Sequence, residues 1–328
     1  MAELLQEAKL LTSEDYADFE KLYEDFKKRA YTEYKFELQP LEFGDFVSSV
    51  EKGLIKCLIL KEDDTPVAFL VYTTCISEAV ELNIIHTINI ENKSARVDAL
   101  LRKFIELTKE ERQDKVVCYP MLGSQKELIS GIAKFGFKFV GIAVLRFFFE
   151  GTNSKEILKM ASMDEMEKCY TLTSWKDEYF DAAVDVVHEA FEVSSDALFD
   201  PRFTTTSGVA DILTKITKDI YAEFLPEATS VLLCDGNPVG FCFANLTGGK
   251  VANIPIVALK KNHQGKGLAK FMLKKTVDKM IEWEEQGAKG LIEVNTCTET
   301  NNFQALKLYR HIGFKEDYNY PQAYLSSK

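Results

Sequence analysis

Residues 264–269 combine glycines and a lysine in an order that could bind phosphate groups. They read Gln-Gly-Lys-Gly-Leu-Ala, after an apolar run at 254–259 and before an amphipathic stretch that begins at Leu268. The first N–H groups of a helix have no partner within it and lie at the positive end of its dipole, so they attract anions. Gly265 and Gly267 would let the backbone approach a phosphate, because neither has a Cβ. The pattern predicts a strand, an anion-binding turn and a helix.

The spacing of this turn excludes two well-known phosphate loops. It is neither Gly-x-x-x-x-Gly-Lys-Ser/Thr nor Gly-x-Gly-x-x-Gly with an acidic residue about 20 positions on. Binding of nucleoside triphosphates or dinucleotides is therefore disfavoured. Taken alone, the turn would be better explained as a plain helix cap.

A second motif follows about 35 residues later. Residues 302–314 read Asn-Phe-Gln-Ala-Leu-Lys-Leu-Tyr-Arg-His-Ile-Gly-Phe and come after an apolar strand at 290–294. Together the two segments resemble the GNAT superfamily of acyl-CoA-dependent N-acetyltransferases. The family's loop has the form Arg/Gln-x-x-Gly-x-Gly/Ala, which this chain matches at Gln264, Gly267 and Ala269. The family's second signature is Asn-x-x-Ala-x-x-Leu-Tyr-x-x-x-Gly-Phe, which the chain matches at Asn302, Ala305, Leu308, Tyr309, Gly313 and Phe314.

The resemblance implies acetyl-CoA as a co-substrate and a set of residues that bind it. Backbone N–H groups at 257–259 would meet the thioester carbonyl, where the family's strand bulges. Pro255 fits such irregularity, because proline cannot donate to a sheet ladder, although a simple edge strand would also tolerate it. The expected cofactor-binding residues are Val257, Ala258, Leu259, Gln264, Gly265, Lys266, Gly267, Leu268, Ala269 and Asn302.

Two residues are candidates for moving protons. Tyr309 occupies the family's general-acid position, and a phenol with a pKa near 10 could protonate the departing thiolate; the alternative is that it only packs beside Leu306. Glu293, flanked by apolar neighbours, is the candidate base. A solvated, outward-facing position for Glu293 is the competing interpretation. Asn253 could only orient water.

The connection from 295 to 301 is longer than in many simple members of the family, and it contains Cys297. A covalent role for Cys297 is disfavoured by the direct attack that the family uses. Acceptor choice is expected in 193–207, where Asp196, Asp200 and the aromatic Phe199 and Phe203 would suit a cationic or amphipathic amine. An ordinary polar loop explains this segment as well. Two histidines, His188 and His311, are read as surface or core residues.

Composition narrows the class of protein. With 51 acidic and 40 basic residues the formal net charge is −11, which argues against a nucleic-acid-binding surface. Neither a signal-peptide pattern nor an 18-residue apolar run is present, so a soluble, cytoplasmic protein with no membrane partner is expected. Seven scattered cysteines and four histidines favour reduced thiols and give no basis for a metal site.

The chain repeats one plan at about half its length of 328 residues. Leu-Thr-Ser opens each half at 11–13 and 172–174, and Gly136-Phe137 mirrors Gly313-Phe314. We expect an α+β fold with two GNAT-like domains, 1–160 and 161–328, each a mixed, mostly antiparallel sheet flanked by helices. The first half has no glycine at 88–95, so it is expected to have lost CoA binding.

The sequence therefore predicts an enzyme that transfers an acetyl group from acetyl-CoA to a primary amine of a small molecule, in a ternary complex. Three alternatives remain: a non-catalytic acyl-CoA sensor, an interaction protein, and an enzyme acting on protein N-termini or lysines. The sequence does not decide the acceptor, the acyl chain or whether the protein is a monomer or a homodimer.

Overall fold

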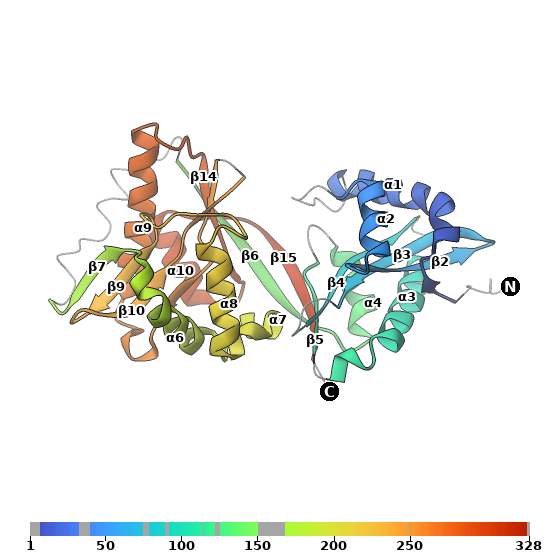
Figure 1. Cartoon of the computed structure of the whole chain (residues 1–328), viewed down its shortest axis with the longest axis horizontal. Helices are drawn as coiled ribbons and strands as arrows, with labels where there is room; N and C mark the ends of the chain where they lie inside the picture. Colours follow the sequence, from blue (N-terminus) through green and yellow to red (C-terminus); the bar gives the residue numbers. More distant parts are fainter. Residues whose placement is uncertain are drawn as a thin grey trace. The chain divides into compact units, whose positions relative to one another are not determined.

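The computed structural model describes residues 7–32, 40–74, 79–88, 92–113, 115–121, 125–149, 168–248 and 250–326. The chain divides into two compact units (Figure 1), Met1–Gly141 with Tyr320–Lys328, and Ile142–Asn319. The junction that the sequence predicts between residues 160 and 161 lies outside the described residues.

The first unit is a sheet with helices on both faces. Phe69 and Val71 of one strand pack with α1 and α2, while the alternate residues Leu70 and Tyr72 pack with α3. Successive strand side chains point to opposite faces, so one apolar strand serves two cores. The strand order is β1 (Lys9–Leu10), β2 (Lys56–Glu62), β3 (Thr65–Thr73), β4 (Ala79–Thr87), β5 (Val116–Tyr119) and the end of β15 (Lys315–Leu325); the helices are α1 (Tyr16–Thr32), α2 (Phe43–Glu51), α3 (Lys93–Leu107) and α4 (Ile129–Ala133).

The second unit contains two sheets. One has the order β6 (Lys138–Phe148), β14 (Glu293–Glu299), β12 (Val251–Asn253), β11 (Asn245–Thr247) and β8 (Glu223–Phe224), with the start of β15 beside β6. Its pair β12–β14 is parallel. The other is antiparallel, in the order β13 (Val257–Leu259), β10 (Asn237–Cys242), β9 (Ser230–Cys234) and β7 (Tyr170–Ser174).

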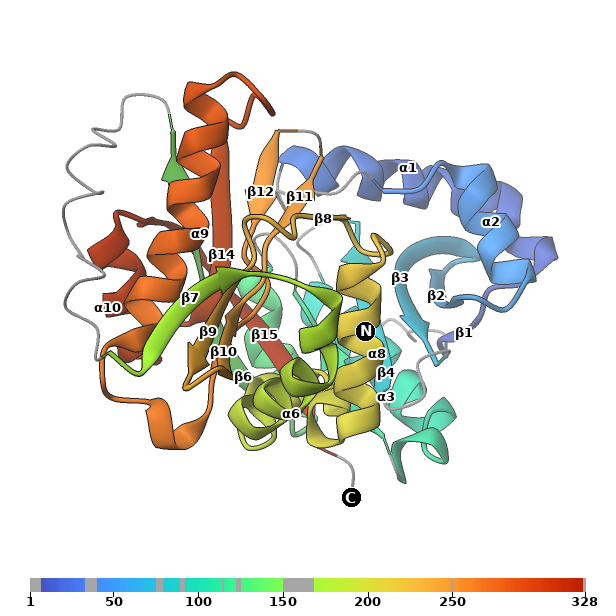
Figure 2. The same cartoon turned by 60° about the vertical axis from the view of Figure 1, so that its left-hand side comes forward.

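Helices cover both faces of the antiparallel sheet (Figure 2). Val231 and Phe241 point to one face, packing with α6 and α8, whereas Leu232 and Cys242 point to the other, packing with α9. The helices are α6 (Phe180–Phe191), α7 (Asp196–Phe199), α8 (Thr206–Thr217), α9 (Leu268–Glu285) and α10 (Phe303–Ile312). This layering leaves the end of β13 beside the first turn of α9.

Each unit takes one strand from the far half of the chain. In the first unit, Ala323 of β15 pairs with Tyr119 of β5. In the second, β6 supplies the partner of β14, with Val144 opposite Cys297. The chain thus leaves the first unit within β6 and returns to it within β15.

The predicted α+β class, with two mostly antiparallel sheet units flanked by helices, is confirmed. The strand predicted at 254–259 begins only at Val257, because Ile254, Pro255 and Ile256 separate β12 from β13. The helix α8 ends at Thr217. Asp219 then adopts a left-handed backbone conformation, with φ 58°, which a continuing helix cannot accommodate.

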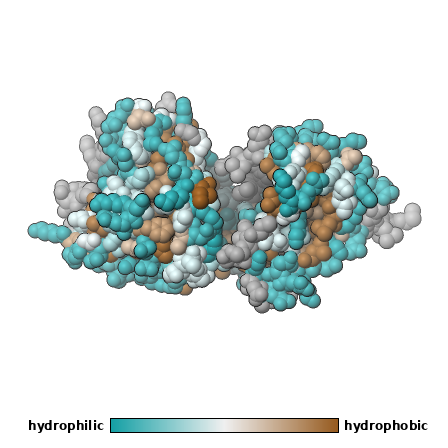
Figure 3. Space-filling model, in the orientation of Figure 1, coloured by the Kyte–Doolittle hydropathy of each residue, from teal (hydrophilic) through white to brown (hydrophobic). Residues whose placement is uncertain are grey.

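In the view of Figure 3, hydrophilic residues cover most of the visible face and apolar residues form small groups. None of the helices in the described ranges has the length and apolar character needed to cross a bilayer. Within the same ranges, no group of three or more His, Cys, Asp or Glu residues could hold a metal ion, and the cysteines, Cys57, Cys118, Cys169, Cys234, Cys242 and Cys297, are free thiols.

Candidate active site

The glycine turn begins α9 in the manner that anion binding requires. Gly265 and Gly267 adopt φ values of 76° and 73°, a backbone region that residues with a Cβ rarely occupy. A Cβ at Gly265 would meet nothing within 4 Å, so this side of the turn is open. Gly267 is the N-cap of α9, and the N–H groups that follow it lie at the helix's positive end. Gln264 supports the turn by donating to the Leu259 carbonyl oxygen over 2.8 Å.

The site lies where two strands diverge. β12 pairs with β14 as far as Asn253 opposite Asn295, and the Ile254 N–H still donates to the Asn295 carbonyl oxygen at 2.9 Å. Beyond Pro255 the chain pairs with β10 instead, so β13 and β14 separate. A cavity of about 440 Å³ occupies the gap, bounded by β13, the glycine turn, the end of β14 and α10.

One edge of β13 faces this cavity with backbone N–H groups. The Ile256 carbonyl oxygen accepts a hydrogen bond from the Phe243 N–H, and the Lys260 N–H donates one to the Val239 carbonyl oxygen. The backbone polar groups of these two residues therefore point toward β10. Because direction alternates along a strand, the N–H groups of Val257 and Leu259 point toward the other edge, and that of Ala258 points toward β10. The edge can therefore offer donors to a carbonyl oxygen placed in the cavity.

Tyr309 lines the same cavity from α10 and is only 6% exposed. Its hydroxyl lies 3.4 Å from the hydroxyl of Thr296, which donates to the Ile254 carbonyl oxygen at 2.9 Å. Burial raises the pKa of Tyr309 well above its ordinary value, while the hydrogen bond with Thr296 opposes the shift. The phenol consequently keeps its proton at neutral pH.

Glu293 is not among the residues that line the cavity. It is 5% exposed, and its Oε1 lies 2.6 Å from a guanidinium nitrogen of Arg146. Arg146 also pairs with Asp317 at 2.8 Å. Glu293 stands three positions before Thr296 on β14, so the two side chains point to opposite faces. The geometry places Glu293 in an ion-pair network, away from Tyr309.

Two other carboxylates do line the cavity, Asp196 from α7 and Glu299 from the end of β14. Loss of hydration raises the pKa of Glu299, and the negative charge of Asp196 adds to the shift. The protein around Asp196 raises the pKa of that carboxyl too, although the side chain keeps contact with water. Glu299 was not a sequence candidate. Thr296 and Thr298 are β-branched residues at alternate positions, and they were the signal in the sequence that the strand continues as far as Glu299.

The turn carries additional positive charge. Lys266 donates to the Tyr170 hydroxyl at 3.3 Å, and that hydroxyl lies 2.8 Å from Nδ1 of His263. Partial burial lowers the pKa of His263, and Lys266 and Lys260 lower it further. Asn302 lines the cavity, and its Oδ1 accepts a hydrogen bond from the Ala305 N–H at 3.1 Å, so it also caps α10.

The structure thus brings most of the predicted site together. Lys266 and Glu293 lie outside the cavity lining, while the remaining predicted site residues line it: Val257, Ala258, Leu259, Gln264, Gly265, Gly267, Leu268, Ala269, Asn302 and Tyr309. Asp196 and Cys297 also line it, whereas His188 instead contacts the Thr204 carbonyl oxygen.

The first unit differs at the corresponding turn. Its helix α3 begins after Asn92, which has φ 58° where the second unit has Gly267. Residues 89–91 lie outside the described ranges. Loss of CoA binding by the first half stays a prediction.

Comparisons with known proteins agree with this architecture. The chain resembles a solved GCN5-related N-acetyltransferase from Sphaerobacter thermophilus, with 14% identity, a TM-score of 0.62, and 98% of this chain and 95% of that one covered. A tandem GNAT protein from the clavulanic acid biosynthesis pathway has 12% identity and a TM-score of 0.55, with 99% of both chains covered. These likenesses show the fold.

A third solved structure is a GCN5-related glucosamine N-acetyltransferase region of a fungal multi-domain β-N-acetylglucosaminidase. It has 10% identity and a TM-score of 0.62, with 99% of this chain and 38% of that one covered. No curated protein sequence matches the chain. Residues 197–314, which contain the glycine turn, β14 and the whole of α10, match the sequence profile of one family. That profile is the model of the acetyltransferase (GNAT) family.

Proposed function

We propose that the protein transfers an acetyl group from acetyl-CoA to a primary amine of a small molecule, at the site in the second unit. The observation that carries this proposal is a single cavity of about 440 Å³ lined by the open glycine turn, the edge of β13 and the Tyr309 side chain. An anion site, a carbonyl site and an acid are the parts that acetyl transfer from a thioester requires.

The residues present fit acetyl-CoA as a co-substrate. Gly265 and Gly267 leave the turn open for a pyrophosphate, and the first N–H groups of α9 would hold it. The N–H groups of Val257 and Leu259 would receive the thioester oxygen. Bound there, the co-substrate supplies the acetyl group to be transferred.

Three side chains that line the cavity, those of Asp196, Glu299 and Tyr309, would bind the amine and move its protons. Asp196 would hold the acceptor as an ammonium ion by its charge, and Glu299 would take the proton that makes the amine nucleophilic. The amine nitrogen then bonds to the carbonyl carbon as the carbon–sulfur bond breaks, and Tyr309 gives its proton to the departing sulfur. The second proton that the nitrogen loses on becoming an amide restores the Tyr309 phenol. Glu299 replaces Glu293 in this scheme, because only Glu299 lines the cavity.

The test uses the full chain. Calorimetric titration should give one acetyl-CoA site, and a free-thiol assay with a panel of primary amines should show acetyl transfer. Gly267→Val should abolish binding, because a β-branched residue is strained at φ 73° and would obstruct the turn. Gly287→Val is the matched control, since Gly287 has φ 64° and follows the far end of α9.

Absence of acetyl-CoA binding would refute the proposal. Binding without thiol release for any amine would instead favour a non-catalytic sensor. Equal loss of binding in the Gly267→Val and Gly287→Val variants would remove the assignment of the turn.

A further inference from the structure

A second cavity of about 310 Å³ lies in the same unit, on the other side of Pro255. Pro255 lines both this cavity and the one that holds Tyr309. The second cavity is bounded by α8, by the segment 200–203 and by β11 and β12. Its size is at the lower end of the range for pockets that bind small molecules. It is thus placed to hold the body of a molecule whose amine reaches the first cavity.

The β-sheet wall of this cavity is a row of amides. Asn245 of β11 stands opposite Asn253 of β12, so both side chains project from the same face of the sheet. The next strand adds Asn295, whose Oδ1 accepts a hydrogen bond of 2.6 Å from the Asn253 amide. Thr247, two positions after Asn245, lies on this face too. The wall offers uncharged polar groups.

Asn245 carries the strongest sign of a ligand. Its side chain lines the cavity, and the residue is only 3% exposed. Its Oδ1 has no hydrogen-bond partner among the residues that the structure describes. Buried acceptors are rarely left unpaired, because they lose their bonds to water without compensation. A donor from a bound molecule would satisfy this oxygen.

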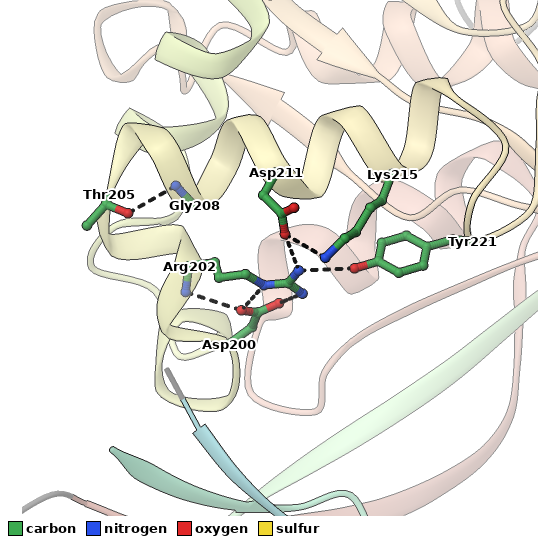
Figure 4. Close-up of polar contacts among 7 residues, drawn as sticks. All are labelled: Asp200, Arg202, Thr205, Gly208, Asp211, Lys215 and Tyr221. Atoms are coloured by element: carbon green, nitrogen blue, oxygen red, sulfur yellow. Dashed lines mark hydrogen bonds and ion pairs between the residues drawn. The ribbon is translucent and has the colours of Figure 1, made fainter. Parts of the chain in front are cut away.

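The charged groups at the cavity are already paired with one another (Figure 4). Arg202 donates to both carboxylate oxygens of Asp200, at 2.8 and 2.6 Å, and to Asp211 at 2.9 Å and the Tyr221 hydroxyl at 3.1 Å. Lys215 pairs with Asp211 at 2.7 Å. Two cations therefore balance two anions, and a ligand carboxylate would have to displace Asp200 from its two-point contact.

The opposite wall is apolar. Ile212 and Ile216 of α8 are buried, as is Ile256, and Phe203 stacks on Phe191 with ring centroids 4.9 Å apart. An alkyl or ring portion of a ligand would pack against these side chains. The cavity therefore combines one apolar wall with one uncharged polar wall.

We infer that this cavity binds the body of the amine acceptor, and that the body carries an uncharged hydrogen-bond donor, a hydroxyl or a carboxamide, which pairs with Asn245. This inference rests on the proposed function, because it assumes that the amine reaches the neighbouring cavity. It excludes acceptors whose second polar group is a carboxylate or an ammonium ion.

The experiment measures binding of four amines to the full chain saturated with CoA, by calorimetry. The probes are L-leucinamide and D-glucosamine, with an amide or hydroxyls, L-leucine, with a carboxylate, and putrescine, with a second ammonium ion. At least one neutral probe should bind more than about tenfold more tightly than L-leucine and putrescine, a clear difference in binding free energy. Comparing the two neutral probes distinguishes the amide from the hydroxyl.

Three variants test the role of Asn245. Asn245→Leu should weaken the preferred neutral probe by more than about tenfold, and Asn245→Asp should shift the preference toward putrescine, because a carboxylate pairs with an ammonium ion. The control is Asn237→Leu at the exposed start of β10. Ala222→Trp fills the cavity from a half-buried position just before β8 and leaves the Asn245 side chain unchanged, so it should also weaken binding even if the Asn245 variants fold poorly.

The inference would be overturned if the wild type preferred L-leucine or putrescine, or if neither neutral probe bound saturably. It would also be overturned if Asn245→Leu and Ala222→Trp left binding unchanged. Failure of acetyl-CoA to bind would overturn the proposed function separately. Acetyl transfer restricted to amines with a second charge would leave the proposed function intact and refute only the inference.

Discussion

Replacing Tyr309 by phenylalanine removes one oxygen atom and leaves the packing of the ring in place. The ring lies 5.5 Å from that of Phe314, centroid to centroid, and the variant retains this contact. Only the 3.4 Å contact with the Thr296 hydroxyl is lost, and Thr296 keeps its bond to the Ile254 carbonyl oxygen. The cost in free energy of unfolding should therefore be about 1 kcal/mol or less.

The expected effect on turnover is much larger. A positioned general acid contributes about 100- to 10,000-fold, which corresponds to about 3–5 kcal/mol in the barrier. Tyr309→Phe should thus lower kcat by that factor while leaving acetyl-CoA affinity close to the wild-type value. The difference between the two magnitudes separates loss of the acid from loss of structure.

The assay is thiol release at saturating amine, with calorimetric titration of acetyl-CoA and urea unfolding in parallel. Tyr179→Phe, a half-buried tyrosine outside the cavity lining, is the control and should keep full turnover. A kcat within about threefold of the wild type would refute the general-acid role, and so would a loss explained by weaker acetyl-CoA binding.

Three further results are expected. The wild-type rate should rise as the pH increases above 4.5, the ordinary pKa of a glutamate carboxyl, because burial and the charge of Asp196 raise the pKa of Glu299 and the base must be deprotonated. Glu299→Gln should lower kcat about 100-fold or more and remove this rise. An unchanged pH–rate profile in the variant would exclude the base role. Gly208→Ala places a Cβ 2.4 Å from the Arg202 carbonyl oxygen, so the free energy of unfolding in urea should fall by about 1–3 kcal/mol. Gly44→Ala in α2 is the control and should be neutral or stabilising, because a Cβ there meets nothing within 4 Å. Equal effects of the two substitutions would contradict the steric argument. Burial lowers the pKa of His86 from 6.5 to about 4, so the unfolded state takes up a proton on this histidine at a higher pH than the folded state does. The free energy of unfolding should therefore fall by up to about 3 kcal/mol as the pH drops from about 6.5 to 4. In urea unfolding, His86→Gln should lose this pH dependence, and an equally steep fall in the variant would exclude His86 as the cause.

Local patterns predicted the parts of the site that depend on neighbouring residues. The glycine turn follows from two glycines before an amphipathic helix, and Pro255 marked the place where the strand is divided. Tyr309 was identified because its motif lies within one helical stretch, α10, and the residues just before it. These features are encoded over about a dozen residues, which is the range that sequence periodicity covers.

The candidate base could not be chosen in the same way. Glu293 and Glu299 lie on one strand, and only the three-dimensional pairing decides which carboxylate reaches the cavity. Arg146, the partner of Glu293, is 147 positions away in the sequence, so no local pattern could show that Glu293 is engaged. The two carboxylates lie on the same face of β14, six positions apart, so their place along the strand and their distant partners decide which one reaches the cavity.

The exchange of β6 and β15 has a consequence for how the chain is made. The sheet of the first unit is completed by Ala323 and its neighbours, which pair with β5 about 200 residues earlier. Synthesis proceeds from the N-terminus, so β5 has no β15 partner until residues about 200 positions later emerge from the ribosome. Contacts between residues so far apart also slow folding, because a long loop must close first. Until β15 has been made, β5 therefore has an unpaired edge, at which the nascent chain can associate with other chains.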